Sequence, residues 1–387
     1  MKNILHISTD SIFMDHVIEQ FEEIKPSISD YFIFSDSINN VRNNKYITHL
    51  PYKEYFSEKI HKKLSNYKCV ILHPLTKEHV YLINKSNKNI RFLWLMWGAD
   101  GLYNKKFGSR WYSKGTTLVL NKNKKEKTVL QKLNNFISST FLFELIYVLR
   151  KKKWSYDWSL KKAIKKINYI APVIEEDYHL LKEKFKTKAK FIQFSLGSLK
   201  TLLNGQKFDI KYNQNNILLG NSADPSNNHI DILNLLHKIN FNGKIICPLS
   251  YGNHDYSEQI KLEGKSLFGA NFVPLIDFLP IKQYQEIINS CGIVVMNHFR
   301  QQAMGNIISA LYQGKKVFLN ENNYSNNFFS LLNIKVYSVQ KDLKSTIENN
   351  DIIEENNIII RNRLNLEKYY SHEEVLEKTR KLIELIT

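Results

Sequence analysis

Cysteine is scarce in this chain, which has three, Cys69, Cys247 and Cys291, among 387 residues. Each falls in an apolar, strand-like stretch or at the end of a helical one, and no Cys-x-x-Cys pair occurs. The pattern predicts buried, reduced thiols of a cytosolic protein, and it argues against a disulfide framework. It also gives no sign of a zinc cluster.

Long apolar runs are also missing. The strongest, FLFELIYVL at 141–149, contains Glu144 and is far shorter than the roughly 20 residues that span a bilayer. The N-terminal sequence MKNILHISTDS is interrupted by His6, so we expect a strand there and no signal peptide. These features predict a soluble or peripheral protein without a membrane span.

Several catalytic signatures are absent as well. The sequence has no Walker-type glycine-rich loop, no Gly-x-Gly-x-x-Gly after a strand and no Gly-x-Ser-x-Gly elbow. It has no Asp-x-Asp, so a metal clamp on a diphosphate is not indicated. We therefore expect no metal and no cofactor, and we expect helix N-termini and basic side chains to meet any diphosphate charge.

Positive charge is abundant. Lys and Arg number 55 against 37 Asp and Glu, which gives a net charge of +18 and a pI near 9.4. Such an excess points to an anionic partner, namely nucleic acid, a membrane surface or a phosphorylated substrate. The alternative is a Lys- and Asn-rich composition from an AT-rich genome. A chain with 43% hydrophobic and 12% aromatic residues is globular, and 387 residues suit two domains.

Strand-like and helical segments alternate in both halves, which predicts an α/β protein with parallel sheets. We expect a GT-B-type arrangement of two Rossmann-like, doubly wound domains. The predicted domains are 1–200, with a basic aromatic insert near 122–168, and 210–368, followed by a C-terminal helix at 369–387 that packs back on the first. The predicted strands are 3–8, 31–35, 69–73, 91–97, 216–220, 244–250, 271–276, 293–298 and 316–320.

Two strand-to-helix turns of the second half are the candidate donor site, because ligands of such sheets bind beyond the carboxyl ends of the strands. The first turn, GNSADPSNN at 220–228, is long and uncharged apart from Asp224. Asn228 is expected to cap the next helix with Asp231 as capping-box partner, and Asp224 to cap the turn locally. The second turn carries Arg300, suited to a phosphate. The candidate donor- and phosphate-binding residues are Gly220, Asn221, Ser222, Asn228, Arg300, Gln301, Gln302, Gly305 and Asn306.

The first half offers three candidates for a proton acceptor. Asp10 follows the first strand, His16 lies in the first helix and Asp100 follows the strand at 91–97. A local structural role, such as capping a helix or a turn, is an equally good interpretation of each residue, and the sequence does not rank the three.

The basic aromatic segment at 141–167 is the candidate membrane and acceptor surface. Basic residues beside tryptophan suit contact with anionic lipid, although a solvated face or a nucleic-acid patch are alternatives. The residues concerned are Arg150, Lys151, Lys152, Lys153, Trp154 and Trp158.

With these motifs in place, the sequence resembles a known family. The stretches WGAD at 97–100, PLSYGN at 248–253, GNSADPSNNHI at 220–230 and RQQAMGNIISALYQGKKVFLNEN at 300–322 carry the likeness. They resemble the bacterial TDP-N-acetylfucosamine:lipid II N-acetylfucosaminyltransferases (4-acetamido-4,6-dideoxygalactosyltransferases) of enterobacterial common antigen synthesis. The likeness covers both halves, but the lysine-rich loop at 122–127 has no counterpart in it.

The resemblance implies a GT-B glycosyltransferase and a dTDP-sugar donor. It implies transfer of a 4-acetamido-4,6-dideoxyhexose to a polyprenyl-diphosphate-linked glycan, for enterobacterial common antigen or O-antigen, at the cytoplasmic face of the bacterial inner membrane. Peripheral attachment to an anionic membrane surface and no nucleic-acid partner are expected. Two other functions stay open, a two-domain nucleotide-sugar epimerase and a non-enzymatic nucleic-acid-binding protein.

Overall fold

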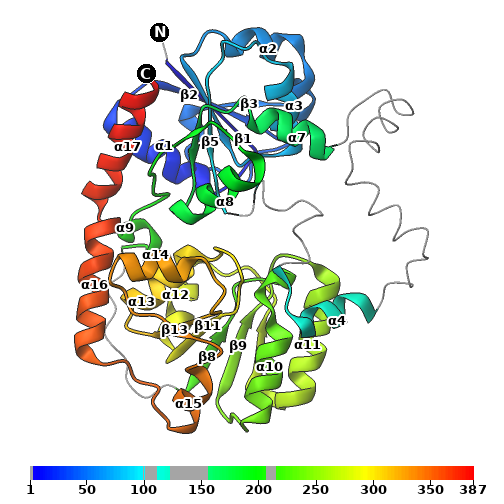
Figure 1. Cartoon of the computed structure of the whole chain (residues 1–387), viewed down its shortest axis with the longest axis vertical. Coiled ribbons are helices and arrows are strands. Elements are labelled where there is room, and N and C mark those ends of the chain that lie inside the picture. The colour runs from blue at the N-terminus through cyan, green and yellow to red at the C-terminus, as the bar shows by residue number, and fades with distance from the viewer. Residues whose placement is uncertain (1–2, 99, 101–110, 123–155, 206–214) are drawn as a thin grey trace. The chain divides into compact units, whose positions relative to one another are not determined.

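The computed structural model describes residues 3–98, 100, 111–122, 156–205 and 215–387. Its described residues divide into two compact units. The first unit comprises residues 3–98, 100, 156–197 and 373–387, and the second comprises 111–122, 198–205 and 215–372. Each unit holds one parallel sheet (Figure 1).

The first unit is built on a parallel sheet of seven strands in the order β3-β2-β1-β4-β5-β6-β7. Its elements in chain order are β1 (Ile4–Ser8), α1 (Phe13–Ile24), β2 (Ser29–Phe34), η1 (Asn44–Tyr46), β3 (Ile47–Leu50), η2 (Tyr52–Phe56), α2 (Glu58–Leu64), β4 (Cys69–His73), α3 (Lys77–Lys85), β5 (Phe92–Leu95), α7 (Tyr156–Ile164), β6 (Tyr169–Ala171), α8 (Glu175–Phe185), β7 (Lys190–Phe191) and α17 (His372–Ile386).

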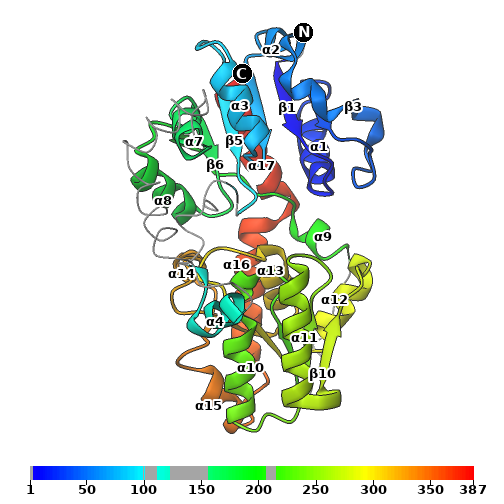
Figure 2. The ribbon, with the colours of Figure 1, turned by 90° about the vertical axis from the view of Figure 1, so that its right-hand side faces the viewer.

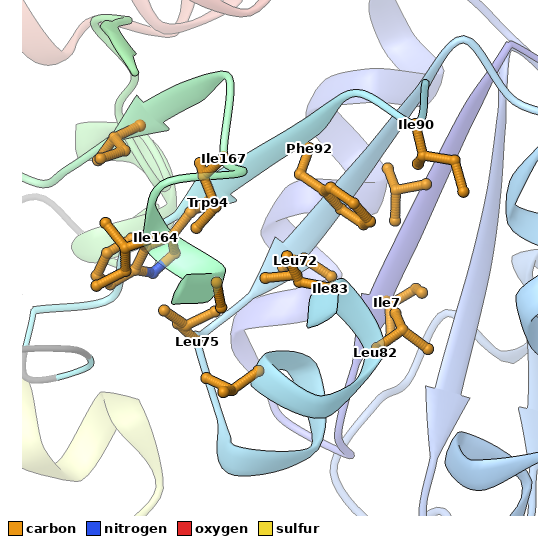
Figure 3. Close-up of a cluster of buried hydrophobic side chains, with 14 of the residues drawn as sticks. Ile7, Leu72, Leu75, Leu82, Ile83, Ile90, Phe92, Trp94, Ile164 and Ile167 are labelled. Atoms are coloured by element: carbon orange, nitrogen blue, oxygen red, sulfur yellow. The ribbon is translucent and has the colours of Figure 1, made fainter. Parts of the chain in front are cut away.

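Helices cover both faces of this sheet, as is usual for parallel sheets. Every residue of β1 and β4 is therefore buried, whichever face its side chain points to. One face packs against α2, α3 and α7, and Figure 3 shows part of this cluster, including Leu72, Trp94 and Ile164. The other face packs against α1 and α17, through residues such as Phe21 and Leu382.

The second unit is built on a parallel sheet of six strands in the order β10-β9-β8-β11-β12-β13. Its elements in chain order are α4 (Lys114–Lys122), α9 (Leu199–Leu202), β8 (Asn216–Leu219), η4 (Pro225–Asn227), α10 (His229–Lys238), β9 (Lys244–Pro248), α11 (His254–Phe268), η5 (Gly269–Asn271), β10 (Phe272–Leu275), α12 (Ile281–Asn289), β11 (Ile293–Met296), α13 (Met304–Tyr312), β12 (Lys316–Leu319), α14 (Ser325–Leu331), β13 (Tyr337–Ser338), α15 (Leu343–Glu348) and α16 (Asn356–Tyr370).

Helices α10 and α11 lie side by side over one face of the second sheet (Figure 2), where Leu233 and Ile260 pack on the strands. Helix α13 contacts β11, β12 and α16 instead. In both units the strand order reverses once, between β1 and β4 and between β8 and β11. This is the topological switch point at which open α/β sheets bind ligands, and the predicted α/β fold with two doubly wound sheets is confirmed.

Candidate functional site

The loops that follow β8 and β11 lie next to each other at the switch point of the second sheet. The two strands pair in parallel, and the N–H of Gly220, directly after β8, donates to the carbonyl of Val295 in β11 at 2.9 Å. Both candidate donor turns therefore leave the sheet at the same edge. This is where a doubly wound sheet positions a ligand.

Local hydrogen bonds shape the first turn. The Asp224 carboxylate accepts from the N–H of Ser226 at 2.9 Å and from its hydroxyl at 2.6 Å, and so starts the short helix η4. The predicted local capping by Asp224 is confirmed. The Asn227 carboxamide oxygen accepts from the N–H of Asn221 at 2.9 Å, and it lies 2.8 Å from Nε2 of His298 in the second turn.

The expectation that Asn228 caps α10 is wrong. Asn228 precedes the helix, but its backbone is left-handed, at φ 53° and ψ 42°, and its side chain makes no capping bond. The carboxamide nitrogen donates instead to the carbonyls of Ser226 at 3.1 Å, Asn297 at 3.0 Å and Trp111 at 3.1 Å. Long-range partners thus outweigh the usual preference of asparagine for capping.

Asp231 is not a capping-box partner either, because its carboxylate faces a segment from the first half of the sequence. It accepts from the Ser113 hydroxyl and from the N–H of Gly115, the latter at 3.2 Å. Asn228, His229 and Ile230 are buried to 5% exposure or less. The start of α10 is therefore covered by the chain itself and already carries a carboxylate.

The second turn holds Arg300 and two glutamines against the first. The Arg300 guanidinium donates to the carbonyl of Gln301 at 2.8 Å and to the Ser226 hydroxyl at 3.4 Å. The Gln302 carboxamide oxygen lies 2.7 Å from that hydroxyl oxygen, and its nitrogen donates to the Asn221 carboxamide oxygen at 3.1 Å. Of the predicted donor residues, Asn221, Arg300 and Gln302 thus belong to one network. Ser222, which is 1% exposed, is tied to Asn227 at 3.3 Å.

The start of α13 differs from that of α10. No acceptor within the described residues binds the backbone N–H groups of Met304, Gly305 and Asn306. Gly305 and Asn306 are only partly buried, and a Cβ on Gly305 would meet only Leu202, at 3.3 Å. Three free N–H groups at the positive end of a helix form a favourable place for an anion.

The three proton-acceptor candidates of the first unit differ in geometry. Asp10 is held by the N–H groups of Asn39, Asn40 and Val41 at 2.7–2.9 Å. Burial opposes its ionisation, but these hydrogen bonds outweigh burial and lower the Asp10 pKa. A carboxylate so well satisfied is a weak base.

Asp100 fastens the end of β5. Its carboxylate accepts from the indole N–H of Trp94 at 2.5 Å and from the backbone N–H groups of Leu75 at 3.1 Å and Trp97 at 3.0 Å. Burial raises the pKa of Asp100, and the hydrogen bonds from these residues offset only part of that effect. These three hydrogen bonds all come from the first unit itself, which is the geometry of a structural carboxylate.

His16 is the third candidate. Burial lowers its pKa, and the carboxylates of Glu19 and Asp15 offset this only in part, so the imidazole is neutral near pH 7. Its buried Nδ1 has no hydrogen-bond partner within the described residues. A neutral imidazole that makes no hydrogen bond to the described residues is suited to accept a proton.

The candidate membrane residues mostly fall elsewhere. Arg150, Lys151, Lys152, Lys153 and Trp154 lie outside the described residues, and Trp158 is half-buried in α7. No helix of the described part is long and apolar enough to cross a membrane. Among the same residues, no group of three or more His, Cys, Asp or Glu side chains is arranged to hold a metal ion.

A comparison of the sequence with protein families now decides the class. The 4-alpha-L-fucosyltransferase family, glycosyl transferase group 56, matches residues 137–361, which is more than half of the chain. The chain belongs to this family. It is therefore a glycosyltransferase, and the matched range includes both donor turns of the second unit.

Comparison with solved structures bears on the fold of the chain. The chain is similar to a glycosyltransferase from Rickettsia africae ESF-5, with 13% identity, a TM-score of 0.63 and coverage of 100% of this chain and 98% of that one. Anabaena Alr3699/HepE in complex with UDP and glucose gives 10% identity, a TM-score of 0.65 and coverage of 100% and 99%. WaaG, a glycosyltransferase involved in lipopolysaccharide biosynthesis, has 9% identity and a TM-score of 0.57, and the match covers 99% of each chain. The predicted GT-B fold is confirmed.

Sequence reasoning missed several residues of this site. His298 and Asn227 join the two turns. The Tyr251 hydroxyl accepts from the Asn221 carboxamide nitrogen at 2.8 Å, and the Ser113 hydroxyl donates to Asp231 of α10. Only for Ser113 did the sequence hold a signal, because serine is a preferred residue at the start of a helix. In the structure its hydroxyl accepts from the N–H of Thr116 at 3.4 Å, as a helix cap does. The helix was therefore detectable, but the surface it packs on was not.

We predict that Gly220→Ala inactivates the donor site. Gly220 has φ 70°, and an added Cβ would lie 2.5 Å from Nε2 of His229 and 2.6 Å from the Asn227 carboxamide oxygen. Asn227 would have to move and would release Asn221 and His298. We expect donor kcat/KM to fall by at least about tenfold, since roughly 1.4 kcal/mol of lost interaction gives that factor.

Gly205→Ala is the matched control, measured with the same kinetic assay and by thermal unfolding. Gly205 has φ 65° but nothing within 4 Å of its added Cβ, so it carries the backbone strain of about 1–2 kcal/mol without the clash. Equal losses of activity in the two variants would refute the role given to the Gly220 contact.

Proposed function

We propose that the chain transfers a 4-acetamido-4,6-dideoxyhexose of the N-acetylfucosamine type from a dTDP-sugar to a polyprenyl-diphosphate-linked glycan. The product belongs to a bacterial surface polysaccharide, either enterobacterial common antigen or O-antigen. Membership of group 56 and the quoted motifs at 97–100, 220–230 and 300–322 support this proposal. A UDP complex of Alr3699/HepE, which has the same fold, supports a nucleotide-linked donor.

The start of α13 is the observation that carries the proposal. Its N–H groups at Met304, Gly305 and Asn306 have no acceptor within the described residues, and they lie directly after the turn that holds Arg300. We place the donor diphosphate there. The start of α10, the helix that follows the other donor turn, is buried beneath residues 111–115.

The remaining donor residues then take distinct roles. Gly220, Asn221, Ser222 and Asn228 hold the two turns in register, because their polar groups bind each other or neighbouring loops. Gln301, whose buried carboxamide oxygen has no partner within the described residues, faces a sugar or ribose hydroxyl. Gln302, Gly305 and Asn306 border the same ligand. We assign no metal to the reaction.

In the reaction, an acceptor hydroxyl attacks the anomeric carbon of the donor sugar, and the bond from that carbon to the diphosphate oxygen breaks. Negative charge grows on the leaving diphosphate. The helix N-terminus of α13 and the nearby Arg300 guanidinium are fixed before reaction, so they stabilise this charge without reorganisation. The hydroxyl proton passes to a base of the first unit.

We assign that base to His16 in preference to Asp10 and Asp100. The two carboxylates are each satisfied by three or more donors of their own unit. Burial lowers the pKa of His16, and its ring makes no hydrogen bond to the described residues. At neutral pH it is in the form that accepts a proton.

A surface of the first unit supports attachment to the cytoplasmic face of the inner membrane. Phe56, Tyr81 and Tyr156 are 48%, 36% and 47% exposed, and the rings of Phe56 and Tyr81 lie 5.1 Å apart. They come from η2, α3 and α7, and α3 contacts both η2 and α7. The same elements and the adjacent α2 carry exposed lysines, namely Lys59, Lys62, Lys63, Lys77, Lys85, Lys161 and Lys162. Exposed aromatics among lysines suit an anionic lipid surface.

Two other functions make different predictions. An epimerase of this fold would convert a free nucleotide sugar without acceptor, and a nucleic-acid-binding protein would bind through the +18 charge alone. The match to a glycosyltransferase family favours transfer over both.

The direct test is incubation of the protein with dTDP-4-acetamido-4,6-dideoxygalactose and a polyprenyl-diphosphate-linked glycan acceptor. We expect release of dTDP and a lipid product heavier by one sugar. Arg300→Ala should lower donor kcat/KM at least about tenfold, because it removes a charge from the diphosphate site. Arg361→Ala, an exposed arginine of α16, is the control and should retain activity.

Other results would overturn this function. Conversion of the nucleotide sugar without acceptor would indicate the epimerase. An absence of dTDP release together with salt-sensitive binding to DNA or RNA would indicate the nucleic-acid-binding protein.

The His16 assignment predicts a defined pH dependence. Because the His16 pKa lies below its ordinary value, wild-type kcat/KM should fall only as the pH drops below about 6.5. His16→Ala should lower kcat by about 10²–10⁴ and remove this acidic limb, with little change in donor KM. Asp10→Asn and Asp100→Asn should lower the melting temperature but keep the limb. Loss of the limb in either of these, or its retention in His16→Ala, would refute the assignment.

The membrane surface is tested by flotation with vesicles of neutral lipid and of the same lipid plus phosphatidylglycerol. We expect binding only to the anionic vesicles. The triple variant Phe56→Ser, Tyr81→Ser and Tyr156→Ser should reduce this binding, because it removes apolar area. Leu331→Ser, which changes a 76% exposed residue of α14, is the control and should bind as wild type does. Equal partitioning to both kinds of vesicle would contradict the assignment.

A further inference from the structure

One segment of the first half of the sequence is part of the second unit. The described chain of the first unit stops at Asp100 and resumes at Tyr156, yet residues 111–122, which lie between them, belong to the second unit. They contain α4, which lies beside α10 in Figure 1. Residues 111–117, which lead into α4 and form its first turns, are called the clasp below.

The clasp is fastened to α10 by backbone and side-chain hydrogen bonds. The N–H of Ser113 donates to the Asn228 carboxamide oxygen at 2.8 Å, and the Asn228 carboxamide nitrogen donates back to the carbonyl of Trp111 at 3.1 Å. The Asp231 carboxylate accepts from the Ser113 hydroxyl and from the N–H of Gly115. Only glycine fits easily at 115, since a Cβ there would lie 3.0 Å from both Asp231 oxygens.

Apolar packing fixes the same segment. Trp111 is 4% exposed and packs edge-on against the ring of Tyr324, with the ring centroids 6.2 Å apart. Thr116 is fully buried. Further along α4, Val119 and Leu120 pack against the core of the second unit. The clasp is therefore an integral part of this unit's surface.

Asn228 links the clasp to the donor turns. The carboxamide that binds Trp111 and Ser113 also binds the carbonyls of Ser226 and Asn297, one in each turn, and is fully buried. Moving the clasp would leave the buried carboxamide oxygen of Asn228 without the N–H of Ser113, which is costly, while its nitrogen would keep the carbonyls of Ser226 and Asn297. A shift of the carboxamide that gives this oxygen a new partner would break its bonds to the two turns.

We propose that the clasp sets the geometry of the donor turns, and that Ser113 and Asp231 are positioning residues for donor binding. The binding part of this inference rests on the proposed function, because it assumes that the donor lies at these turns.

The test compares Asp231→Ala with wild type by hydrogen exchange and by kinetics. We expect faster amide exchange at 111–117, 220–228 and 297–303, and no change in the first unit. Donor KM should rise about tenfold, as expected for the loss of hydrogen bonds to a charged group, while acceptor KM stays within about twofold. A general loss of folding would lower the active fraction and kcat without this split.

Four further variants keep the test decisive. Ser113→Thr retains the hydroxyl and should restore near wild-type donor KM relative to Ser113→Ala. Gly115→Ala is the milder perturbation if Asp231→Ala does not fold. Asp255→Ala removes a 93% exposed acid from the first turn of α11 and should change neither exchange nor KM.

The outcomes separate the clasp from the proposed function. Unchanged exchange at 220–228 and 297–303 in Asp231→Ala and Gly115→Ala would overturn the clasp, whatever the enzyme's substrate. Altered exchange with equal changes in both KM values would also overturn the positioning role. If wild type neither binds dTDP nor transfers sugar, the proposed function fails, while the exchange result still decides whether the clasp holds the turns.

Discussion

One buried carboxamide holds the candidate donor site together. Asn228 accepts from Ser113 and donates to the carbonyls of Trp111, Ser226 and Asn297, so three separate stretches of chain meet on a single side chain. Its left-handed backbone is one that asparagine tolerates better than most residues. Because a buried amide must satisfy its donors and acceptor, this arrangement fixes the turns after β8 and β11 relative to each other.

The electrostatics of the site follow from this arrangement. Asp231 sits in the first turn of α10 and interacts with the clasp, so the favourable end of that helix is already used. The start of α13 keeps its N–H groups and lies beside Arg300 in the neighbouring turn. The long neutral turn at 220–228 therefore acts as a frame for the second turn, and the positive field comes from α13 and Arg300.

Interactions between near neighbours in the sequence were predictable, and those between distant residues were not. The alternation of strand-like and helical segments predicted the strand at 69–73, which is β4 with the same bounds. The local capping by Asp224 was predictable because it joins residues only two apart. The cap expected from Asn228 failed because its partners lie 115–117 and 69 residues away. Strand β3 was missed since this edge strand is only half-buried and lacks a strong apolar pattern. The site residues themselves remain predictions.

A crystal structure of the protein with dTDP would test the central claim most directly. The account predicts diphosphate oxygens within about 2.7–3.2 Å of the backbone N–H groups of Gly305 and Asn306, with residues 111–117 still seated on α10. A diphosphate bound at the start of α10, with Ser113 displaced from Asn228, would contradict it.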